Sequence, residues 1–355
     1  METLQPKFGR IVDTGDKAEL RYLISDLDHP DTASEVTVVT WTRGDTNLVI
    51  SVPHGGTVGS DTSPAGNLLC ETGHLIETRK CTPQYPSLTY TRDAGTDVIA
   101  REIHKILAKE GLKPHVIECH IHRSKVECNR HVSEIAIQRR GQEAELVYTT
   151  FHNWIRQALQ MGLKENKDGC LLIDLHGHGH PHEYIELGYR LTASLLNNIA
   201  NEEVDQMNWR TIVTSSARHE FTMRHLMKRR FGTSNEAIRE ALIGQSSFAG
   251  CIIHQFSSEQ ILKNIKCVPS EMRIGPGKLG YYNGGFIVRS HSKLARVDSL
   301  QIELPMSIRC QAGEARDTAI LALAAAIKQF HNLHYNIQDR HVNGNDLSKI
   351  GRQKH

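Results

Sequence analysis

Two histidines follow directly after apolar segments that are typical of buried strands. His54 follows the segment 47–53, and His176 follows the segment 171–175. Ligands of parallel α/β sheets bind at the carboxyl ends of the strands, so both histidines are expected at the same edge of one sheet. Imidazole is among the commonest zinc ligands in proteins. The sequence therefore favours a metal site that includes His54 and His176.

Further histidines follow in the stretch that begins at His176. A metal-binding histidine usually donates its second ring N–H to a carboxylate or a carbonyl, which fixes its tautomer. Because the stretch follows an apolar strand, His176 is expected at the end of the sheet rather than in a surface tract that scavenges metal ions. For His178 and His180 two roles stay open: either residue lines a pocket, or both are polar loop residues.

A third group of polar side chains lies between residues 123 and 130. A guanidinium binds a carboxylate through two parallel hydrogen bonds, and an asparagine amide supplies a further donor. Arg123, Asn129 and Arg130 are therefore candidates for binding a carboxylate. Ordinary surface salt bridges are the alternative for the two arginines.

An acidic residue, Glu303, lies inside the apolar segment 301–304. Glutamate is almost never fully buried without a partner, and apolar neighbours raise its pKa whereas a nearby metal lowers it. Glu303 is therefore a candidate general base. The alternative is an outward-facing strand residue, because Gln301 and Glu303 share one face by the two-residue period.

Apolar patterns predict alternating strands and helices along most of the chain. Two strands at 36–42 and 47–53, joined by a turn at Gly44-Asp45, come first. Further strands are predicted at 115–119, 171–175, 285–289 and 299–304, and helices at 97–111, 143–162, 217–229, 234–243 and 313–334. This alternation favours an α/β fold with a mixed, mostly parallel central sheet flanked by helices.

The composition is that of an ordinary globular protein. The chain has 355 residues and a formal net charge of +2, which gives no reason to expect a nucleic acid or a membrane as partner. It has no apolar stretch of about 18 residues and no secretory signal pattern, so a cytoplasmic location is expected. The eight cysteines contain no C-x-x-C pair, and several lie in apolar runs, which predicts reduced structural thiols.

Five short motifs occur in the same order as in the N-formylglutamate amidohydrolase family, which this chain resembles. They are Pro53-His54-Gly55-Gly56, Arg123 to Asn129-Arg130, Asp174-Leu175-His176, Gly284 to Arg289, and Gln301-Ile302-Glu303-Leu304. That family is similar to the zinc carboxypeptidases and aspartoacylases, so the resemblance implies a zinc-carboxypeptidase-like (phosphorylase/hydrolase-like) architecture. We expect one catalytic domain over 1–335, with an unmatched N-terminal extension at 1–44 and a flexible polar tail at 336–355.

The resemblance implies that His54 and His176 bind zinc. The carboxypeptidase pattern H-x-x-E would place the next ligand three residues after the first histidine, but that position is Thr57. A zinc site in an enzyme has three protein ligands, so the third must come from elsewhere. Asp97, at the start of the helix predicted after the long polar segment, is the expected ligand, with Asp93 as the alternative. An ordinary helix N-cap is the other role open to Asp97.

The same resemblance implies that Glu303 is the general base, that Arg123 polarises the scissile carbonyl, and that Asn129 and Arg130 bind the free carboxylate of the substrate. These roles predict a zinc-dependent amidohydrolase that cleaves the amide bond of an N-acyl amino acid, such as N-formylglutamate, or of a peptide with a free carboxylate. The alternatives are a metallocarboxypeptidase or deacylase for a larger peptide or acyl substrate, and a non-catalytic binding protein of the same fold.

Overall fold

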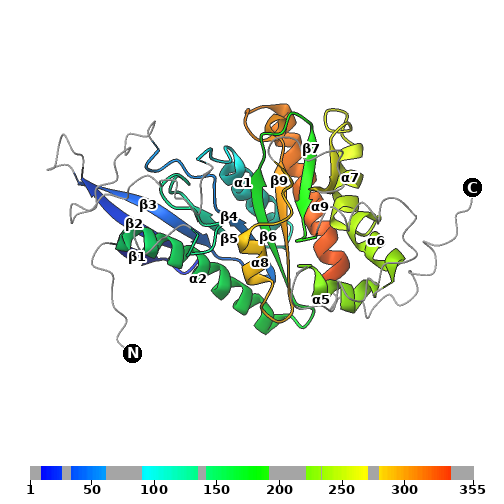
Figure 1. Cartoon of the computed structure of the whole chain (residues 1–355), viewed down its shortest axis with the longest axis horizontal. Coiled ribbons are helices and arrows are strands. Elements are labelled where there is room, and N and C mark those ends of the chain that lie inside the picture. Colours follow the sequence, from blue (N-terminus) through cyan, green and yellow to red (C-terminus); the bar gives the residue numbers. More distant parts are fainter. Residues whose placement is uncertain are drawn as a thin grey trace, which may run out of the picture.

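The protein is described here by a computed structural model, which covers residues 9–25, 33–60, 90–134, 141–191, 221–232, 234–270 and 280–336. The described residues form a nine-stranded sheet with helices on both faces (Figure 1). The strand order is β1-β2-β3-β5-β4-β6-β9-β7-β8. The predicted α/β fold with a mixed central sheet is confirmed.

After the first four strands, helices separate most of the later strands along the chain, although β6 and β7 follow each other directly. The strands are β1 (Gly9–Asp13), β2 (Lys17–Ser25), β3 (Ala33–Thr42), β4 (Leu48–Val52), β5 (His115–Cys119), β6 (Cys170–Gly177), β7 (Tyr184–Gly188), β8 (Lys266–Pro269) and β9 (Val297–Leu304). The helices are α1 (Thr96–Lys109), α2 (Gln142–Glu165), α5 (Arg224–Leu226), the π-helix η2 (Met227–Phe231), α6 (Asn235–Ile243), α7 (Phe248–Ser257), α8 (Phe286–His291), the 3-10 helix η4 (Met306–Ile308) and α9 (Glu314–His334).

β4 lies near the middle of the sheet and pairs in parallel with β5 on one side and β6 on the other. The consecutive strands predicted at 36–42 and 47–53 are present as β3 and β4 but do not pair with each other, because β3 runs antiparallel to β5, which separates it from β4. Both edges of β4 are occupied by parallel partners, β5 and β6. The chain that passes through Gly44-Asp45 therefore connects two strands that are not neighbours in the sheet, with β5 between them.

The N-terminal segment, for which no motif was matched, belongs to the same sheet. β1, β2 and β3 form an antiparallel extension that continues the sheet beyond β5 (Figure 1). On the other side, β6 pairs in parallel with β9, and β7 runs antiparallel to β9 and parallel to β8. The centre of the sheet is therefore parallel, as expected, and most of its antiparallel pairs come from the N-terminal extension.

The central strands are buried on both faces. Leu48, Ile50 and Val52 of β4 belong to one hydrophobic core, whereas Val49 belongs to the other. Successive side chains of a strand point to opposite faces, so a continuous apolar run is what a strand covered on both sides requires. Helices α1, α7 and α9 supply the first core, and α2 supplies the second. This arrangement leaves the strand ends as the place where polar side chains gather.

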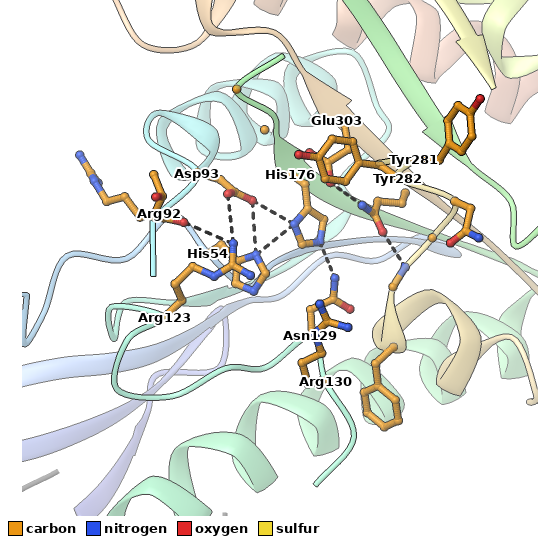
Figure 2. Close-up of a pocket in the computed structure, with 18 of the residues that line it drawn as sticks. His54, Arg92, Asp93, Arg123, Asn129, Arg130, His176, Tyr281, Tyr282 and Glu303 are labelled. Carbon is orange, nitrogen blue, oxygen red and sulfur yellow. Dashed lines mark hydrogen bonds and ion pairs between the residues drawn. The ribbon is translucent and has the colours of Figure 1, made fainter. Parts of the chain in front are cut away.

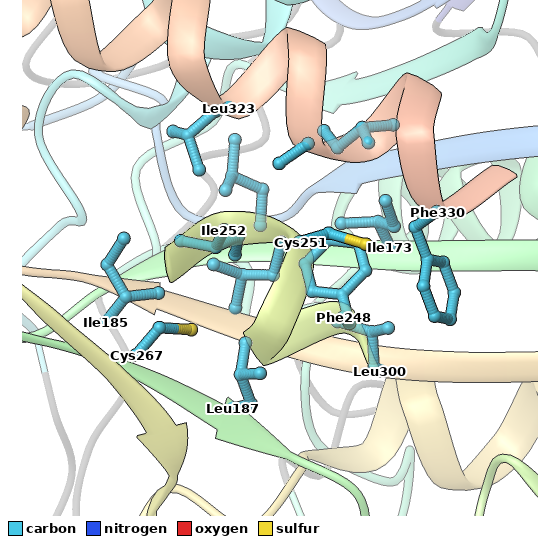
Figure 3. Close-up of a cluster of buried hydrophobic side chains, with 14 of the residues drawn as sticks. Ile173, Ile185, Leu187, Phe248, Cys251, Ile252, Cys267, Leu300, Leu323 and Phe330 are labelled. Carbon is cyan, nitrogen blue, oxygen red and sulfur yellow. The ribbon is translucent and has the colours of Figure 1, made fainter. Parts of the chain in front are cut away.

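The larger core holds β6 and β9 in place (Figure 3). Ile173 of β6 and Leu300 of β9 are buried beneath helices α7 and α9. Phe248 of α7 meets Phe330 of α9 edge-on, with ring centroids 5.1 Å apart. Burying each such side chain contributes about 1.5–3 kcal/mol to folding. The core therefore fixes the two strands whose ends carry His176 and Glu303.

Most predicted elements are present in the structure. The helices predicted at 97–111, 143–162, 234–243 and 313–334 correspond to α1, α2, α6 and α9. The strand predicted at 285–289 is wrong, because this segment begins helix α8. Of the helix predicted at 217–229, the described part from residue 221 contains only α5 and the π-helix η2.

Six cysteines lie in the described residues, and all six are free. Five are buried and Cys310 is exposed, which agrees with the predicted reduced thiols, whereas Cys70 and Cys81 lie outside the described residues. The tail from residue 337 onward also lies outside them. None of the helices described has both the length and the apolar character needed to cross a membrane.

Candidate active site

His54 lies in the loop directly after β4 and is only 2% exposed. The loop packs closely on the chain that leaves β5, since a Cβ on Gly56 would lie 2.3 Å from the carbonyl of His120. Only glycine permits so close an approach of two backbones. The Val58 N–H then donates to the same carbonyl at 2.9 Å. This packing holds His54 at the carboxyl edge of the sheet.

Three donor groups converge at this edge (Figure 2). His176 comes near the end of β6, and Asp93 lies in the loop before α1. The Nδ1 atoms of His54 and His176 are 3.1 Å apart, and one Asp93 oxygen lies 3.3 Å from the first and 3.0 Å from the second. All three side chains are buried. We call His54, Asp93 and His176 the primary cluster.

The separations in the primary cluster match those between ligands of one small metal ion. Histidine nitrogens and aspartate oxygens bind zinc at about 2.0–2.2 Å in tetrahedral geometry, which separates neighbouring ligand atoms by about 3.3–3.6 Å. The observed separations of 3.0, 3.1 and 3.3 Å are close to that value. Two imidazoles and one carboxylate are a ligand set typical of zinc enzymes. The residues present therefore fit a zinc ion.

A carboxylate orients each histidine of the primary cluster. His176 Nε2 lies 2.9 Å from Asp174, and His54 Nε2 bonds to Glu127. The other oxygen of Glu127 accepts a hydrogen bond from Arg123 at 2.7 Å. Metal-binding histidines commonly have such a partner on the far nitrogen, which fixes the tautomer and directs the near nitrogen to the metal. Both rings therefore present Nδ1 to the centre of the cluster.

The charged groups of the primary cluster shift the pKa values of their neighbours. Burial lowers the pKa of His176, but the carboxylates of Asp174 and Asp93 outweigh burial and raise that pKa well above its usual value. Burial raises the pKa of Asp93, yet hydrogen bonds with His176 and His54 hold it below its usual range. Asp93 is therefore an anion, which is the form that binds a metal ion.

Asp97 lies outside the primary cluster. Helix α1 begins at Thr96, whose hydroxyl donates to the Asp93 carbonyl at 2.8 Å. The first turn of the helix directs the Asp97 carboxylate to Arg101, which donates to it at 2.7 Å. The structure thus places the expected third ligand, Asp97, in an ion pair with Arg101, and places its alternative, Asp93, beside the two histidines. Asp97 is not the helix N-cap either, since Gly95 holds that position.

Glu303 lies next to the primary cluster on the neighbouring strand. It pairs in register with His176 across β6 and β9, so both side chains share one face of the sheet. Glu303 is 3% exposed and accepts a hydrogen bond from Gln301. Burial raises the pKa of Glu303 to about 8, the charge of His176 opposes that rise, and Asp93 adds to it. Glu303 is therefore an inward-facing acid rather than an outward-facing strand residue.

Arg123 lies beside the primary cluster with its side chain 11% exposed. Its guanidinium nitrogens are 2.7 Å from Glu127 and 3.6 Å from Asp93. Burial lowers the pKa of Arg123, but the two carboxylates outweigh burial and raise it. Arg123 is thus a fixed positive charge close to both the cluster and the space in front of it.

A cavity of about 630 Å³ opens from the primary cluster. The side chains that line it include six arginines: Arg92, Arg123, Arg130, Arg190, Arg289 and Arg309. Within the described residues, Arg130 and Arg289 make no ion pair with a carboxylate, and Arg289 lies over the ring of Phe286 at 5.9 Å. A cavity lined by an excess of positive charge attracts an anionic ligand.

Of the predicted pair Asn129 and Arg130, the asparagine is already engaged with the protein. Its Oδ1 accepts a hydrogen bond from the Ile287 N–H at 3.0 Å, and its Nδ2 lies 3.2 Å from His176 Nε2. A Cβ on Gly285 would lie 2.2 Å from the Asn129 amide, so the start of α8 fits directly against it. Asn129 therefore positions α8 and contacts His176, whereas Arg130 is exposed at the cavity.

Two further residues of this site, Glu127 and Arg190, are not distinguished by the sequence patterns. Glu127 is 1% exposed and orients His54, but no periodic pattern distinguishes it from its neighbours between residues 123 and 130. Arg190 follows β7 with φ 62 and donates to the Gly284 carbonyl at 3.0 Å. The signal that identified His54, a polar residue after a strand, applies to Arg190 as well, but β7 itself was not predicted.

His178 and His180 lie in the loop between β6 and β7, which agrees with the role of polar loop residues, but both are buried in that loop. Gly177 and Gly179 line the cavity, but the two histidines between and after them do not. His178 and His180 are 1% and 7% exposed, so they are not solvated loop residues. Instead they face β7, where Glu186 bonds to His180.

The chain matches no family model. No curated protein matches its sequence. A gene product of Agrobacterium tumefaciens is similar in structure, with a TM-score of 0.42 and 12% identity over 83% of this chain and 94% of that chain. N-formylglutamate amidohydrolase from Ralstonia eutropha is similar with a TM-score of 0.39 and 12% identity over 84% of this chain and 100% of that one. A product-bound structure of the ectoine utilization protein EutE (DoeB) from Ruegeria pomeroyi is also similar, with a TM-score of 0.39 and 11% identity over 93% of this chain and 71% of that chain.

Proposed function

We propose that this protein is a zinc-dependent amidohydrolase that cleaves the amide bond of an N-acyl amino acid. The observation that carries the proposal is the primary cluster, in which two imidazole nitrogens and one carboxylate oxygen lie within 3.3 Å of one another beside a buried acid. His54, Asp93 and His176 would hold the zinc ion. When bound there, zinc supplies Lewis-acid activation of water and of a carbonyl oxygen.

Glu303 is the proposed general base. Its carboxylate lies on the same face of the sheet as His176, and it lines the cavity. Burial holds the pKa of Glu303 near neutrality, at about 8, so the group can both accept and return a proton at neutral pH. In the proposed reaction Glu303 takes a proton from the attacking water and delivers it to the departing nitrogen. The new C–O bond forms first, and the amide C–N bond breaks once the nitrogen has taken up the proton, which yields a carboxylic acid and a free amine.

Arg123 is proposed to stabilise the negative charge that develops on the carbonyl oxygen. The guanidinium is buried beside Asp93 and held by Glu127, so it needs little reorganisation to reach that charge. Preorganised donors of this kind are commonly worth about 3–4 kcal/mol of transition-state stabilisation.

The free carboxylate of the substrate is proposed to bind at Arg130. This residue lines the cavity and, within the described residues, has no carboxylate partner of its own. Asn129 stabilises the same part of the cavity wall, because its Oδ1 accepts a hydrogen bond from the Ile287 N–H at the start of α8. Arg289 of α8 lines the cavity as well, so the substrate end of the cavity carries positive charge from two segments.

A hydrolysis screen tests this proposal. Purified protein is incubated with N-formyl, N-acetyl and longer N-acyl derivatives of several amino acids, and the release of free amine is measured. We expect turnover of at least one substrate class, loss of turnover after a chelator is added, and recovery with added Zn²⁺. Preference for long acyl chains or for peptides would favour a deacylase or a carboxypeptidase on the same site. Absence of turnover for every substrate would contradict the proposal.

A further inference from the structure

The chain between β6 and β7 gathers a second set of metal-binding side chains. β6 ends at Gly177 and β7 begins at Tyr184, and the short connection carries His178, His180 and His182. The imidazole rings lie close together, with centroids 5.1 Å apart for the first two, 5.0 Å for the last two, and 5.5 Å for the outer two. None of these histidines has a role in the amidohydrolase proposed above.

An acid from the next strand faces this group. Glu186 lies in β7 and is fully buried. The ligand atoms that His178, His182 and Glu186 can offer lie within 4.8 Å of one another, and His182 Nε2 is 3.5 Å from a Glu186 oxygen. We call these three residues the second cluster. Like the primary cluster, it consists of two histidines and one carboxylate.

The surrounding residues orient the donors of the second cluster. His178 Nε2 donates to the Tyr184 carbonyl at 2.7 Å, and His178 Nδ1 accepts a hydrogen bond from the His180 N–H at 3.1 Å, which an ion bound at Nδ1 has to replace. A backbone carbonyl on the far ring nitrogen is the usual partner of a metal-binding histidine.

Glu186 is held in a similar way. His180 Nδ1 lies 2.5 Å from one of its oxygens, and the hydroxyl of Ser270 donates to the other. The Ser270 hydroxyl in turn accepts a hydrogen bond from the Tyr282 N–H at 2.7 Å. A carboxylate fixed by two donors is a preorganised ligand, because metal-binding carboxylates are themselves hydrogen-bonded by surrounding groups.

We propose that His178, His182 and Glu186 form a second binding site for a divalent transition-metal ion of the zinc type. Neutral imidazoles with one carboxylate are the donor set that selects such ions over magnesium or calcium, which prefer oxygen ligands. The separation of 3.5 Å between His182 Nε2 and the Glu186 oxygen is longer than the 3.0–3.3 Å separations in the primary cluster, so we expect the second site to contract on binding and to have the lower affinity.

The second site lies one strand away from the proposed base. Glu186 pairs in register with Glu303 across β7 and β9, so the two carboxylates share one face of the sheet. A cation bound at Glu186 offsets the negative charge that acts on Glu303. The second ion is therefore placed to influence the primary site through charge, without contacting the substrate.

Metal titration tests the second site directly. The full-length protein is stripped with a chelator and titrated with Zn²⁺, and the bound metal is counted per chain. We expect two ions, one bound more tightly than the other. The variant His182→Gln is expected to retain the tight ion and to weaken the second by at least about tenfold. Because the His182 side chain is 27% exposed, this substitution should leave the fold intact.

Matched variants separate this inference from the proposed function. His254→Gln alters an exposed histidine of α7 and should still bind two ions. Glu186→Gln should lose the second ion, and circular dichroism shows whether it folds. One ion per chain in the wild type, unchanged in His182→Gln, would show that the second cluster is only a hydrogen-bonded network and would overturn the inference. The number of bound ions is measured without any turnover. The titration therefore tests the second site even if the hydrolysis screen finds no substrate.

Discussion

The primary and second clusters present the same donor set in two different surroundings. Each combines two histidines with one carboxylate, and each includes a histidine from the end of β6 or just after it, whose ring is fixed by a hydrogen-bond partner. The primary cluster opens into a cavity beside Glu303 and Arg123, whereas the lining of that cavity includes no residue of the second cluster. The two clusters therefore differ in access rather than in donor type, since the primary cluster lies beside a cavity and a buried acid.

The largest effect should come from removing a donor of the primary cluster. His176→Ala is expected to lose the tightly bound zinc and to lower kcat/KM by about 10³-fold or more, because several kcal/mol of transition-state stabilisation disappear with the ion. Zinc content and steady-state kinetics measure this. Retained activity together with lost zinc would break the assignment of catalysis to the primary cluster. His254→Gln is the matched control.

Replacing the proposed base should separate chemistry from metal binding. Glu303→Gln is expected to lower kcat by about 10²–10⁴-fold with zinc content unchanged, which is the usual contribution of general base catalysis. Glu118→Gln is the control, since Glu118 is also a buried strand acid with its pKa raised to about 7 by burial, but it is paired with Arg101 away from the cavity. Equal losses in both variants would point to a general effect of removing a buried acid.

Changing the partner of His54 should weaken only the primary cluster. Glu127→Gln is expected to lower zinc affinity there by about 10- to 100-fold, because the carboxylate orients His54 without binding the ion. Competition with a fluorescent chelator measures the affinity. If the weaker of the two sites loses affinity instead, the assignment of the tight ion to the primary cluster is wrong.

The smallest effect concerns substrate recognition. Arg130→Ala is expected to raise KM about tenfold for substrates with a free carboxylate, since one charge-assisted hydrogen bond is worth about 1.5–3 kcal/mol. The corresponding carboxamide substrates should show little change, which makes the ratio of the two kcat/KM values the diagnostic measurement. Arg10→Ala, in the exposed N-terminal part of the sheet, is the control. An unchanged ratio would exclude Arg130 as the carboxylate-binding residue.

The sequence was sufficient to predict the parts of the site that follow directly from strand ends. His54 and His176 each come at or just after the end of a fully buried strand, and apolar runs identify such strands without any tertiary information. Because β4 and β6 are parallel neighbours, their ends bring the two histidines together. Glu303 is also identifiable from local sequence, because it is a charged residue inside an apolar run.

Long-range arrangement explains what the sequence did not predict. The position of β5 between β3 and β4 depends on strand pairing between distant parts of the chain. The local sequence at the Gly44-Asp45 turn contains no signal for that pairing. The segment 285–289 has a short apolar run typical of a strand, but Asn129 caps its first turn and α8 forms. The choice between Asp93 and Asp97 as metal ligand depends on where α1 begins, because Asp93 precedes the helix and Asp97 lies in its first turn. Helix boundaries are the least reliable part of a sequence prediction.

Crystallography at the zinc absorption edge tests the central claim most directly. Crystals of protein loaded with one equivalent of Zn²⁺ should show an anomalous difference peak about 2.0–2.2 Å from the Nδ1 atoms of His54 and His176 and from an Asp93 oxygen. Excess Zn²⁺ should add a weaker peak among His178, His182 and Glu186. A first peak at the second cluster, or no peak between His54, Asp93 and His176, would contradict the account.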